Sequence, residues 1–238
     1  MRLIKIDTQI NREVKMDNMT NRYNLTPELV SNGIYLDFEG EGKKRDGTIP
    51  SPHIAGIYKP YMESYKYSVL FFKSDWKPVK SGHNVANDAI GSFKVLMEEL
   101  INEAEVENRR IFYWTIHEKT IIQMHAPELL ERFERVGFNL HKPAKKFANR
   151  RGLLRDSDEK KGLNQFIKIL KKASPLIVAC QPTAAEACRR LDNYSIKKKR
   201  WRLWTQEQKN VAKDLIRYNK DDCLGVFRLA KKIGNSRY

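Results

Sequence analysis

The sequence predicts a single α/β domain built on a mixed β-sheet. Three strand-like runs come first, and the Gly, Pro and polar residues that separate them are typical of an antiparallel meander. These runs are Ile34 to Glu39, Ile54 to Tyr58 and Tyr67 to Phe72. The aromatic run Arg110 to Thr115 then leads directly into a helical segment. A strand followed by a helix after such a meander indicates a mixed sheet flanked by helices on both faces.

The length of 238 residues is sufficient for one large hydrophobic core. We expect residues 31–238 to form this domain. Residues 1–30 are polar and rich in Asn, so we expect an N-terminal extension, although the short run LIKI near its start could add an edge strand.

Apolar residues at helical spacing predict the helices that cover the sheet. One such face recurs between residues 84 and 104 and includes Ile90. A later helix is marked by Leu163, Phe166, Ile167 and Leu170, and the last helix by Val226, Ala230 and Ile233.

Two helix starts are predicted from capping-box spacing, in which a Thr precedes a Glu or Gln by three residues. The first pairs Thr183 with Glu186, and the second pairs Thr205 with Gln208. The strongly basic segment from residue 140 to residue 161 is predicted to be an exposed loop.

The charge of the chain favours a polyanionic partner. Lys and Arg number 45 against 29 acidic residues, which gives a formal net charge of +16. Each Lys or Arg placed near a phosphate releases condensed counterions, so nucleic acid is the expected partner. The alternative is that the charge serves only solubility.

Three cysteines, Cys180, Cys188 and Cys223, lack C-x-x-C spacing, which argues against both a disulfide framework and a zinc site. We expect them to be reduced. The N-terminus lacks the apolar core of a signal peptide, and no apolar run approaches the roughly 18 residues of a membrane helix. The sequence therefore predicts a cytoplasmic protein without a membrane partner.

Two carboxylates lie side by side in the first strand, which reads IYLDFE. Because strand side chains alternate between faces, Tyr35, Asp37 and Glu39 share one face. Two anions this close repel unless a cation neutralises them, and Mg²⁺ or Mn²⁺ prefers carboxylate oxygens. The alternative is a solvated strand edge with two hydrated acids.

Further candidate ligands come from distant parts of the chain. Tyr218 and Asp222 are four residues apart and so share one face of a helix. That pair would combine a metal ligand with a phenol able to orient a water molecule. Glu118 stands at the start of the helix that follows the Arg110 to Thr115 run.

The segments YLDFEG, YWTIHEKTII and YNKDDC resemble the three sequence blocks of the DEDD exonucleases in the tyrosine-containing subtype. The resemblance is strongest to the YprB-like branch of the ribonuclease H-like superfamily and extends weakly from Gly33 to Ile233. Two residues depart from the family pattern: Glu118 stands where most members have Asp, and Asn139 stands where members often have an acid.

The resemblance implies a ribonuclease H-like fold and a metal-dependent 3′-5′ exonuclease acting on single-stranded ends of DNA or RNA. Asp37, Glu39, Glu118 and Asp222 would hold two Mg²⁺ or Mn²⁺ ions about 3.5 to 4 Å apart. Tyr218 would align the attacking water. The alternative is a nucleic-acid-binding module that keeps the fold with weak or absent catalysis.

Two basic segments are candidate nucleic-acid contacts, and for each the alternative is a plain solvated surface. Trp201 and Trp204, which lie in one of these segments, could stack on bases or serve as core anchors. Elsewhere, His117, next to Glu118, could shuttle a proton or make only local hydrogen bonds. The candidate basic residues are Lys197, Lys198, Lys199, Arg200 and Arg202 in one segment, and Lys145, Lys146, Arg150 and Arg151, with Lys142, in the other.

Overall fold

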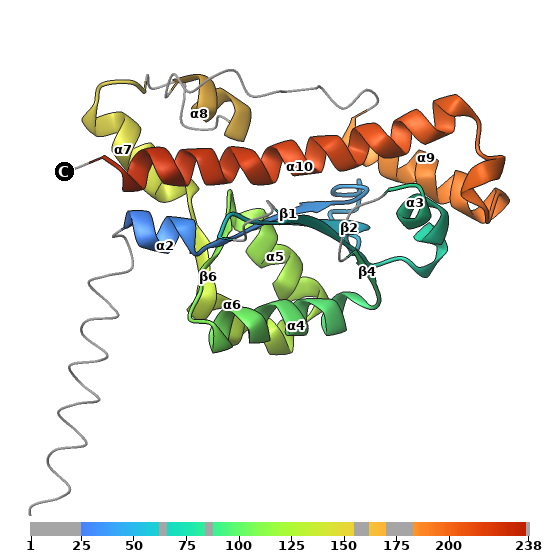
Figure 1. Ribbon diagram of the computed structural model, residues 1–238, viewed down its shortest axis with the longest axis horizontal. Coiled ribbons are helices and arrows are strands. Elements are labelled where there is room, and N and C mark those ends of the chain that lie inside the picture. Colours follow the sequence, from blue (N-terminus) through green and yellow to red (C-terminus); the bar gives the residue numbers. More distant parts are fainter. Residues whose placement is uncertain (1–24, 62–65, 84–87, 155–161, 170–182, 237–238) are drawn as a thin grey trace, which may run out of the picture.

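The computed structural model describes residues 25–61, 66–83, 88–154, 162–169 and 183–236 (Figure 1). Its centre is a mixed sheet of six strands in the order β4-β3-β2-β1-β5-β6. The strands are β1 (Ile34–Glu39), β2 (Ile54–Lys59), β3 (Lys66–Phe71), β4 (Ala89–Ile90), β5 (Ile111–Tyr113) and β6 (Gly137–Asn139). Strands β1, β2 and β3 pair antiparallel. On the other side of β1, β5 and β6 add in parallel. The predicted α/β class and the leading meander are confirmed.

Helices cover both faces of the sheet, as predicted. In Figure 1 the long helix α10 runs along one face, and α4, α5 and α6 lie against the other. The α-helices are α2 (Pro27–Ser31), α3 (Lys77–Ser81), α4 (Phe93–Val106), α5 (Ile116–His125), α6 (Leu130–Val136), α7 (His141–Arg150), α8 (Leu163–Ile169), α9 (Ala184–Lys197) and α10 (Gln206–Gly234). Short 3-10 turns are η2 (Ser74–Trp76), η3 (Pro127–Leu129) and η5 (Trp201–Leu203).

The sheet divides the hydrophobic core into two parts, and strand β1 contributes to both. Ile34, Leu36 and Phe38 pack into the part formed with α4, α5 and α6. Tyr35 packs into the other part, with side chains of α10. This alternation directs every second side chain of β1, including Asp37 and Glu39, toward the α10 face.

Both predicted capping sites begin helices. The Thr183 hydroxyl accepts a hydrogen bond from the Glu186 amide, and the resulting helix, α9, continues to Lys197. Thr205 and Gln208 form a complete capping box at the start of α10, which is 29 residues long. A helix of this length spans the whole sheet, so it can carry side chains to the centre of the domain.

The prediction of an exposed loop from residue 140 to residue 161 is wrong in its first half, which forms helix α7. Pro143, Ala144, Phe147 and Ala148 are buried and form one apolar stripe on this helix. The density of Lys and Arg masks that stripe in the sequence. Residues 155–161 lie outside the described part of the chain.

The helix predicted between residues 84 and 104 begins later than its apolar pattern indicates. Ile90 belongs to the short edge strand β4, which pairs in parallel with β3. The helix α4 starts at Phe93, because Ser92 caps it by accepting a hydrogen bond from the Val95 amide.

Part of the predicted N-terminal extension packs on the domain. Leu25 and Val30, before and within α2, are buried in the core on the α10 side. The LIKI run, Leu170 and Cys180 lie outside the described residues. In the described ranges, no helix combines the length and the apolar character needed to cross a bilayer.

Helix α8 packs tightly on α10 because Gly225 leaves room for it. A Cβ atom at Gly225 would lie 2.9 Å from the Ile167 Cδ1 atom and 3.2 Å from the Leu163 Cδ2 atom. The missing side chain therefore brings Leu163 close to the face of α10 that carries Tyr218 and Asp222.

Candidate metal centre

Three carboxylates from two distant segments meet on the α10 face of the sheet. Asp37 and Glu39 project from β1, and Asp222 projects from α10 toward them. One ligand atom of each lies within 4.8 Å of the others. The strand and the helix are separated by most of the chain, yet together they form one compact acidic cluster.

Tyr218 stands one helical turn before Asp222 and is hydrogen-bonded to its carboxylate. The pKa of the Tyr218 phenol is raised by burial and by the negative charges of Asp222, Glu39 and Asp37. Tyr218 therefore remains a neutral hydrogen-bond donor at physiological pH and does not serve as a base.

Glu118 is buried and closes a capping box at the start of α5. Its Oε2 atom accepts hydrogen bonds from the Thr115 amide and the Thr115 hydroxyl, both at 3.2 Å. It is not a member of the compact cluster of Asp37, Glu39 and Asp222. The structure places Glu118 beside the cluster, with one of its oxygens already engaged in the helix cap.

All five predicted site residues line one cavity of about 370 Å³. Its walls come from the end of β1 and the segment after it, the start of α5, Leu163 of α8, the start of α9, and α10. His117 and Trp114 also line it. The pKa of His117 is lowered by burial, so its imidazole is neutral at pH 7.

Burial and mutual repulsion favour the protonated form of every acid in this cavity. The pKa of Asp37 is raised well above its ordinary value by burial and then by the charges of Glu39 and Asp222. Burial, with the charge of Asp222, raises the pKa of Glu39 to about 8. Burial also raises the pKa of Glu118 to about 7 and that of Asp222 to about 6.

The cluster fits a divalent cation. In the part of the chain that the structure describes, no Lys or Arg forms an ion pair with Asp37, Glu39 or Asp222. Buried charges in proteins are normally paired or bind metals. Three carboxylates at this separation offer the hard oxygen ligands that Mg²⁺ and Mn²⁺ prefer.

Asn219, which the sequence reasoning did not select, holds Asp37 in place. Its Nδ2 atom donates to the Asp37 Oδ2 atom at 2.7 Å and to the Asp37 carbonyl at 3.2 Å. The Tyr67 hydroxyl donates to the Asn219 Oδ1 atom at 2.7 Å. Asn219 is completely buried, so this chain of hydrogen bonds fixes its amide orientation and, through it, the Asp37 carboxylate.

The glycine opposite Asp37 makes room for Asn219. Asp37 is paired with Gly56 across β1 and β2. A Cβ atom at position 56 would overlap the Asn219 Oδ1 atom and lie 3.0 Å from the Cys223 sulfur. Only glycine at this position lets α10 approach the sheet closely enough for Asn219 to reach Asp37.

We expect Gly56→Ala to destabilise the protein by about 1–3 kcal/mol, because the added methyl group overpacks a filled interior. A thermal unfolding experiment should show a midpoint lowered by about 2–10 °C for a domain of this size. Gly162→Ala is the matched control, since a Cβ atom there has no neighbour within 4 Å. Equal midpoints for the two variants would contradict the packing described here.

In the basic segment at the end of α9, Lys197, Arg200 and Arg202 are exposed, and the other two cations make local contacts. Lys199 forms an ion pair with Asp75 at 2.8 Å, and Lys198 donates to Gln208. Trp204 is buried and donates to the Lys198 carbonyl. The Trp201 ring lies where a Cβ atom at Gly82 would be. Trp204 is therefore a core anchor, and the partly buried Trp201 packs against the same core.

The other basic segment lies on and just after α7. Lys146, Arg150 and Arg151 are exposed, and the Arg151 guanidinium lies over the Phe147 ring. Lys145 is partly buried on the same helix. No residue of either basic segment lines the carboxylate cavity. Their role in nucleic-acid binding stays a prediction.

A second acidic group beside the sheet has a structural role. Asp192 of α9 pairs with the Lys73 ammonium at 2.5 Å and the His53 imidazole at 2.9 Å, and accepts from the Trp76 indole at 2.7 Å. Its pKa is about 2, since these hydrogen bonds outweigh the effect of its burial. The Lys73 ammonium already neutralises this carboxylate, so the group binds α9 to the sheet edge.

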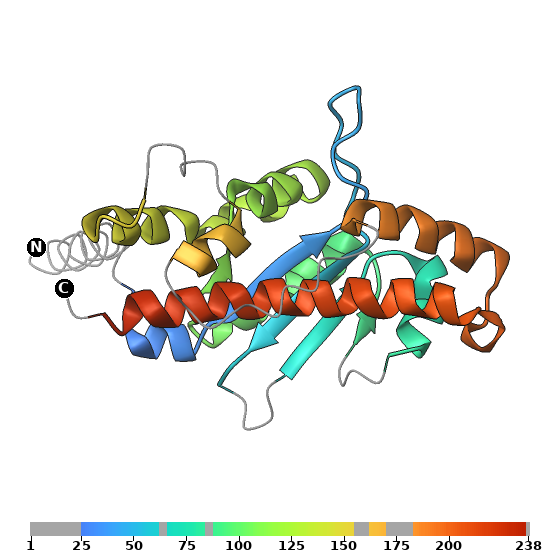
Figure 2. The ribbon, with the colours of Figure 1, turned by 90° about the horizontal axis from the view of Figure 1, so that it is seen from above.

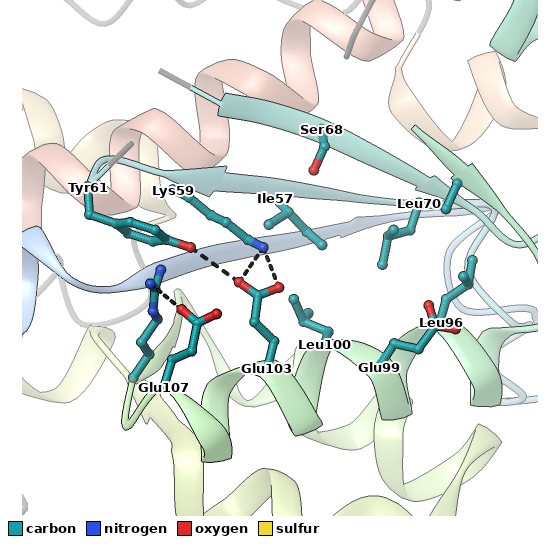
Figure 3. A pocket seen from close by; sticks show the side chains of 12 residues that line it. Ile57, Lys59, Tyr61, Ser68, Leu70, Leu96, Glu99, Leu100, Glu103 and Glu107 are labelled. Atoms are coloured by element: carbon teal, nitrogen blue, oxygen red, sulfur yellow. Dashed lines mark hydrogen bonds and ion pairs between the residues drawn. The ribbon is translucent and has the colours of Figure 1, made fainter. Parts of the chain in front are cut away.

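A second cavity, of about 390 Å³, lies on the opposite face of the sheet, against α4. In Figure 3 its Lys59 ammonium and Tyr61 hydroxyl both point to the Glu103 carboxylate. Glu107 pairs with Arg109, whose guanidinium lies over the Tyr61 ring at 3.3 Å. Two of its three carboxylates, those of Glu103 and Glu107, thus form ion pairs within the cavity, in contrast to the carboxylates of the first.

Comparisons with models of known protein families, with curated proteins and with solved structures find no match for this chain. The chemistry of the site is therefore inferred from its own geometry.

Proposed function

We propose that this protein is a ribonuclease H-like, metal-dependent nuclease whose site is the cavity around Asp37, Glu39 and Asp222. The single observation that carries the proposal is the convergence of these three carboxylates, which form no ion pair with a described Lys or Arg, within 4.8 Å. Burying carboxylates without a neutralising cation costs free energy, and acids with perturbed pKa values in a cleft are candidates for a functional site.

The sheet supports the proposed fold. A meander of three antiparallel strands is followed by two strands that add in parallel beside the first, which is the arrangement implied by the resemblance of the sequence blocks. Asp37 and Glu39 lie at the end of the central strand β1, where side chains from α5 and α10 reach them.

Asp37, Glu39 and Asp222 would hold Mg²⁺ or Mn²⁺, and Glu118 stands beside them as a further ligand. When bound, two such ions would supply charge stabilisation at the attacking and leaving oxygens of a phosphodiester. The residues of the chain perform the remaining tasks. Tyr218, held by Asp222, presents a neutral hydroxyl that can orient a water, and Asn219 keeps the Asp37 carboxylate in position.

The substrate class follows from the charge of the chain and the dimensions of the cavity. A net charge of +16 favours a polyanion. A cavity of about 370 Å³ is in the size range of a small-ligand site and has space for one end of a strand. We therefore propose single-stranded DNA or RNA ends as the substrate, with 3′-5′ polarity taken from the resemblance alone.

The test is degradation of single strands labelled at the 5′ or the 3′ end, with Mn²⁺ or with EDTA. We expect labelled DNA or RNA to shorten only with Mn²⁺, and a 3′-5′ enzyme to release the 3′ label first. If the DNA and RNA strands both bind but neither is degraded at any Mn²⁺ or Mg²⁺ concentration, the result would instead favour the nucleic-acid-binding module without catalysis.

A further inference from the structure

The segment between β1 and β2, residues 40–53, extends away from the body of the domain as a narrow loop (Figure 2). We call it the β1–β2 arm. It begins directly after Glu39, so the strand that carries the acid pair also carries the arm. Three consecutive cations near its tip, Lys43, Lys44 and Arg45, are exposed.

Hydrogen bonds fix the tip of the arm. The Lys44 amide donates to the Thr48 carbonyl at 2.8 Å, and the Gly47 amide donates to the Lys44 carbonyl at 3.0 Å. Asp46 accepts from both the amide and the hydroxyl of Thr48. Gly47, with φ at 89°, adopts the left-handed conformation that this turn requires.

The base of the arm is fixed as well. The His53 amide donates to the Glu39 carbonyl, and the Phe72 amide donates to the His53 carbonyl. The buried His53 imidazole pairs with Asp192 of α9. The arm is thus hydrogen-bonded to the sheet at its base and closed at its tip by a turn with a defined shape, on which the three cations lie.

The arm also forms one wall of the carboxylate cavity. Gly40, Gly42, Ile49, Pro50 and Pro52 line it. A cavity of about 370 Å³ holds the end of a strand, so the rest of the strand must leave across the surrounding surface. The arm is part of that surface.

The cations of the tip are available to an anionic ligand. Within the described ranges, no acidic side chain forms an ion pair with Lys43, Lys44 or Arg45. Two acids lie near them in the arm: Asp46 accepts hydrogen bonds from Thr48, and the Glu41 carboxylate lies 3.8 Å from the His53 imidazole. The tip therefore carries an excess of positive charge at the end of the arm whose base lines the cavity.

We propose that Lys43, Lys44 and Arg45 bind the backbone phosphates of a single strand whose end occupies the carboxylate cavity. This inference rests on the proposed function. It assigns strand binding to the arm, which sequence reasoning did not select, in addition to the segments around Lys198 and Lys146.

The test compares the triple variant Lys43→Ala/Lys44→Ala/Arg45→Ala with wild type in EDTA, which prevents hydrolysis. Affinity for fluorescent 12-nucleotide oligo-dT and oligo-U is measured by anisotropy over a range of NaCl concentrations. Each phosphate contact contributes about 0.7 to the salt slope for single strands, so we expect a slope lower by about 2. At 0.1 M NaCl the affinity should fall about 10- to 100-fold.

The matched control is Lys77→Ala/Lys213→Ala/Lys231→Ala, which removes three exposed cations that do not line the cavity. It should keep most of the wild-type affinity. An arm variant with the affinity and slope of this control would overturn the inference. Because the assay is independent of hydrolysis, an inactive wild-type protein would refute the proposed function without deciding the role of the arm.

Discussion

Asp222→Asn and Asp37→Asn are each expected to lower Mn²⁺-dependent degradation of single strands by at least about 10²- to 10³-fold. Removing one group that stabilises transition-state charge typically has an effect of this size. The amide has the shape of the carboxylate but lacks its charge, so it would weaken cation binding without leaving a cavity. Initial rates on a labelled oligonucleotide at saturating Mn²⁺ measure the effect.

The chain supplies a matched control on the same helix. Asp221 precedes Asp222, and its pKa is also raised by burial, but it does not line the cavity. Asp221→Asn should therefore retain most of the wild-type rate. Comparable losses in Asp221→Asn and Asp222→Asn, or a wild-type rate in Asp37→Asn, would place the chemistry elsewhere.

The second large effect is expected in the stability of the protein without metal. The ordinary pKa of Glu is about 4.3 and that of Asp about 3.9. In the folded protein the pKa values of Glu39, Glu118 and Asp222 rise to about 8, 7 and 6 because these carboxyls are buried. At pH values between the ordinary pKa and the raised pKa of each group, the folded state binds more protons than the unfolded state. The free energy of unfolding therefore falls as pH rises through this range. In EDTA, the thermal midpoint should be higher near pH 5 than near pH 8.

Mn²⁺ should reverse this loss at pH 8. A ligand at 100 times its Kd stabilises the folded state by about 2.7 kcal/mol, which corresponds to a midpoint shift of about 5–10 °C for a domain of this size. The shift should be smaller at pH 5, where protons compete for the carboxylates. The double variant Glu39→Gln/Asp222→Asn should show a flatter pH profile and little response to Mn²⁺. A midpoint insensitive to millimolar Mn²⁺ in wild type would argue against the metal centre.

The parts of the fold that local sequence patterns determine were predictable. Period-2 alternation in β1 correctly placed Asp37 and Glu39 on one face, and two capping patterns located the starts of α9 and α10. Helix α7 was missed because its four Lys and Arg residues are interspersed with an equally small stripe of buried small and apolar residues. Its existence depends on burial of that stripe, which a local reading of charge does not reveal.

The candidate site was predictable in its acids but not in its supporting contacts. Asn219 contacts Asp37 only because Gly56 lies opposite Asp37 in the paired strand, and that register is a tertiary property. Gly56, in the middle of an apolar strand, was the available sequence signal that another segment approaches this strand closely. The basic residues of the arm were visible in the sequence as KKR, but the fact that the base of their loop lines the cavity follows from where β1 ends.

The capping box of α5 explains why position 118 carries Glu and not the Asp that the resemblance implies. A capping box needs a side chain long enough to reach back to the Thr115 amide, and both of its hydrogen bonds use the Glu118 Oε2 atom. One carboxylate thus joins a helix terminus to the acidic cavity. Drawing that oxygen toward a bound ion would loosen the first turn of α5, so hydrogen–deuterium exchange at the Thr115 amide is a built-in reporter of occupancy.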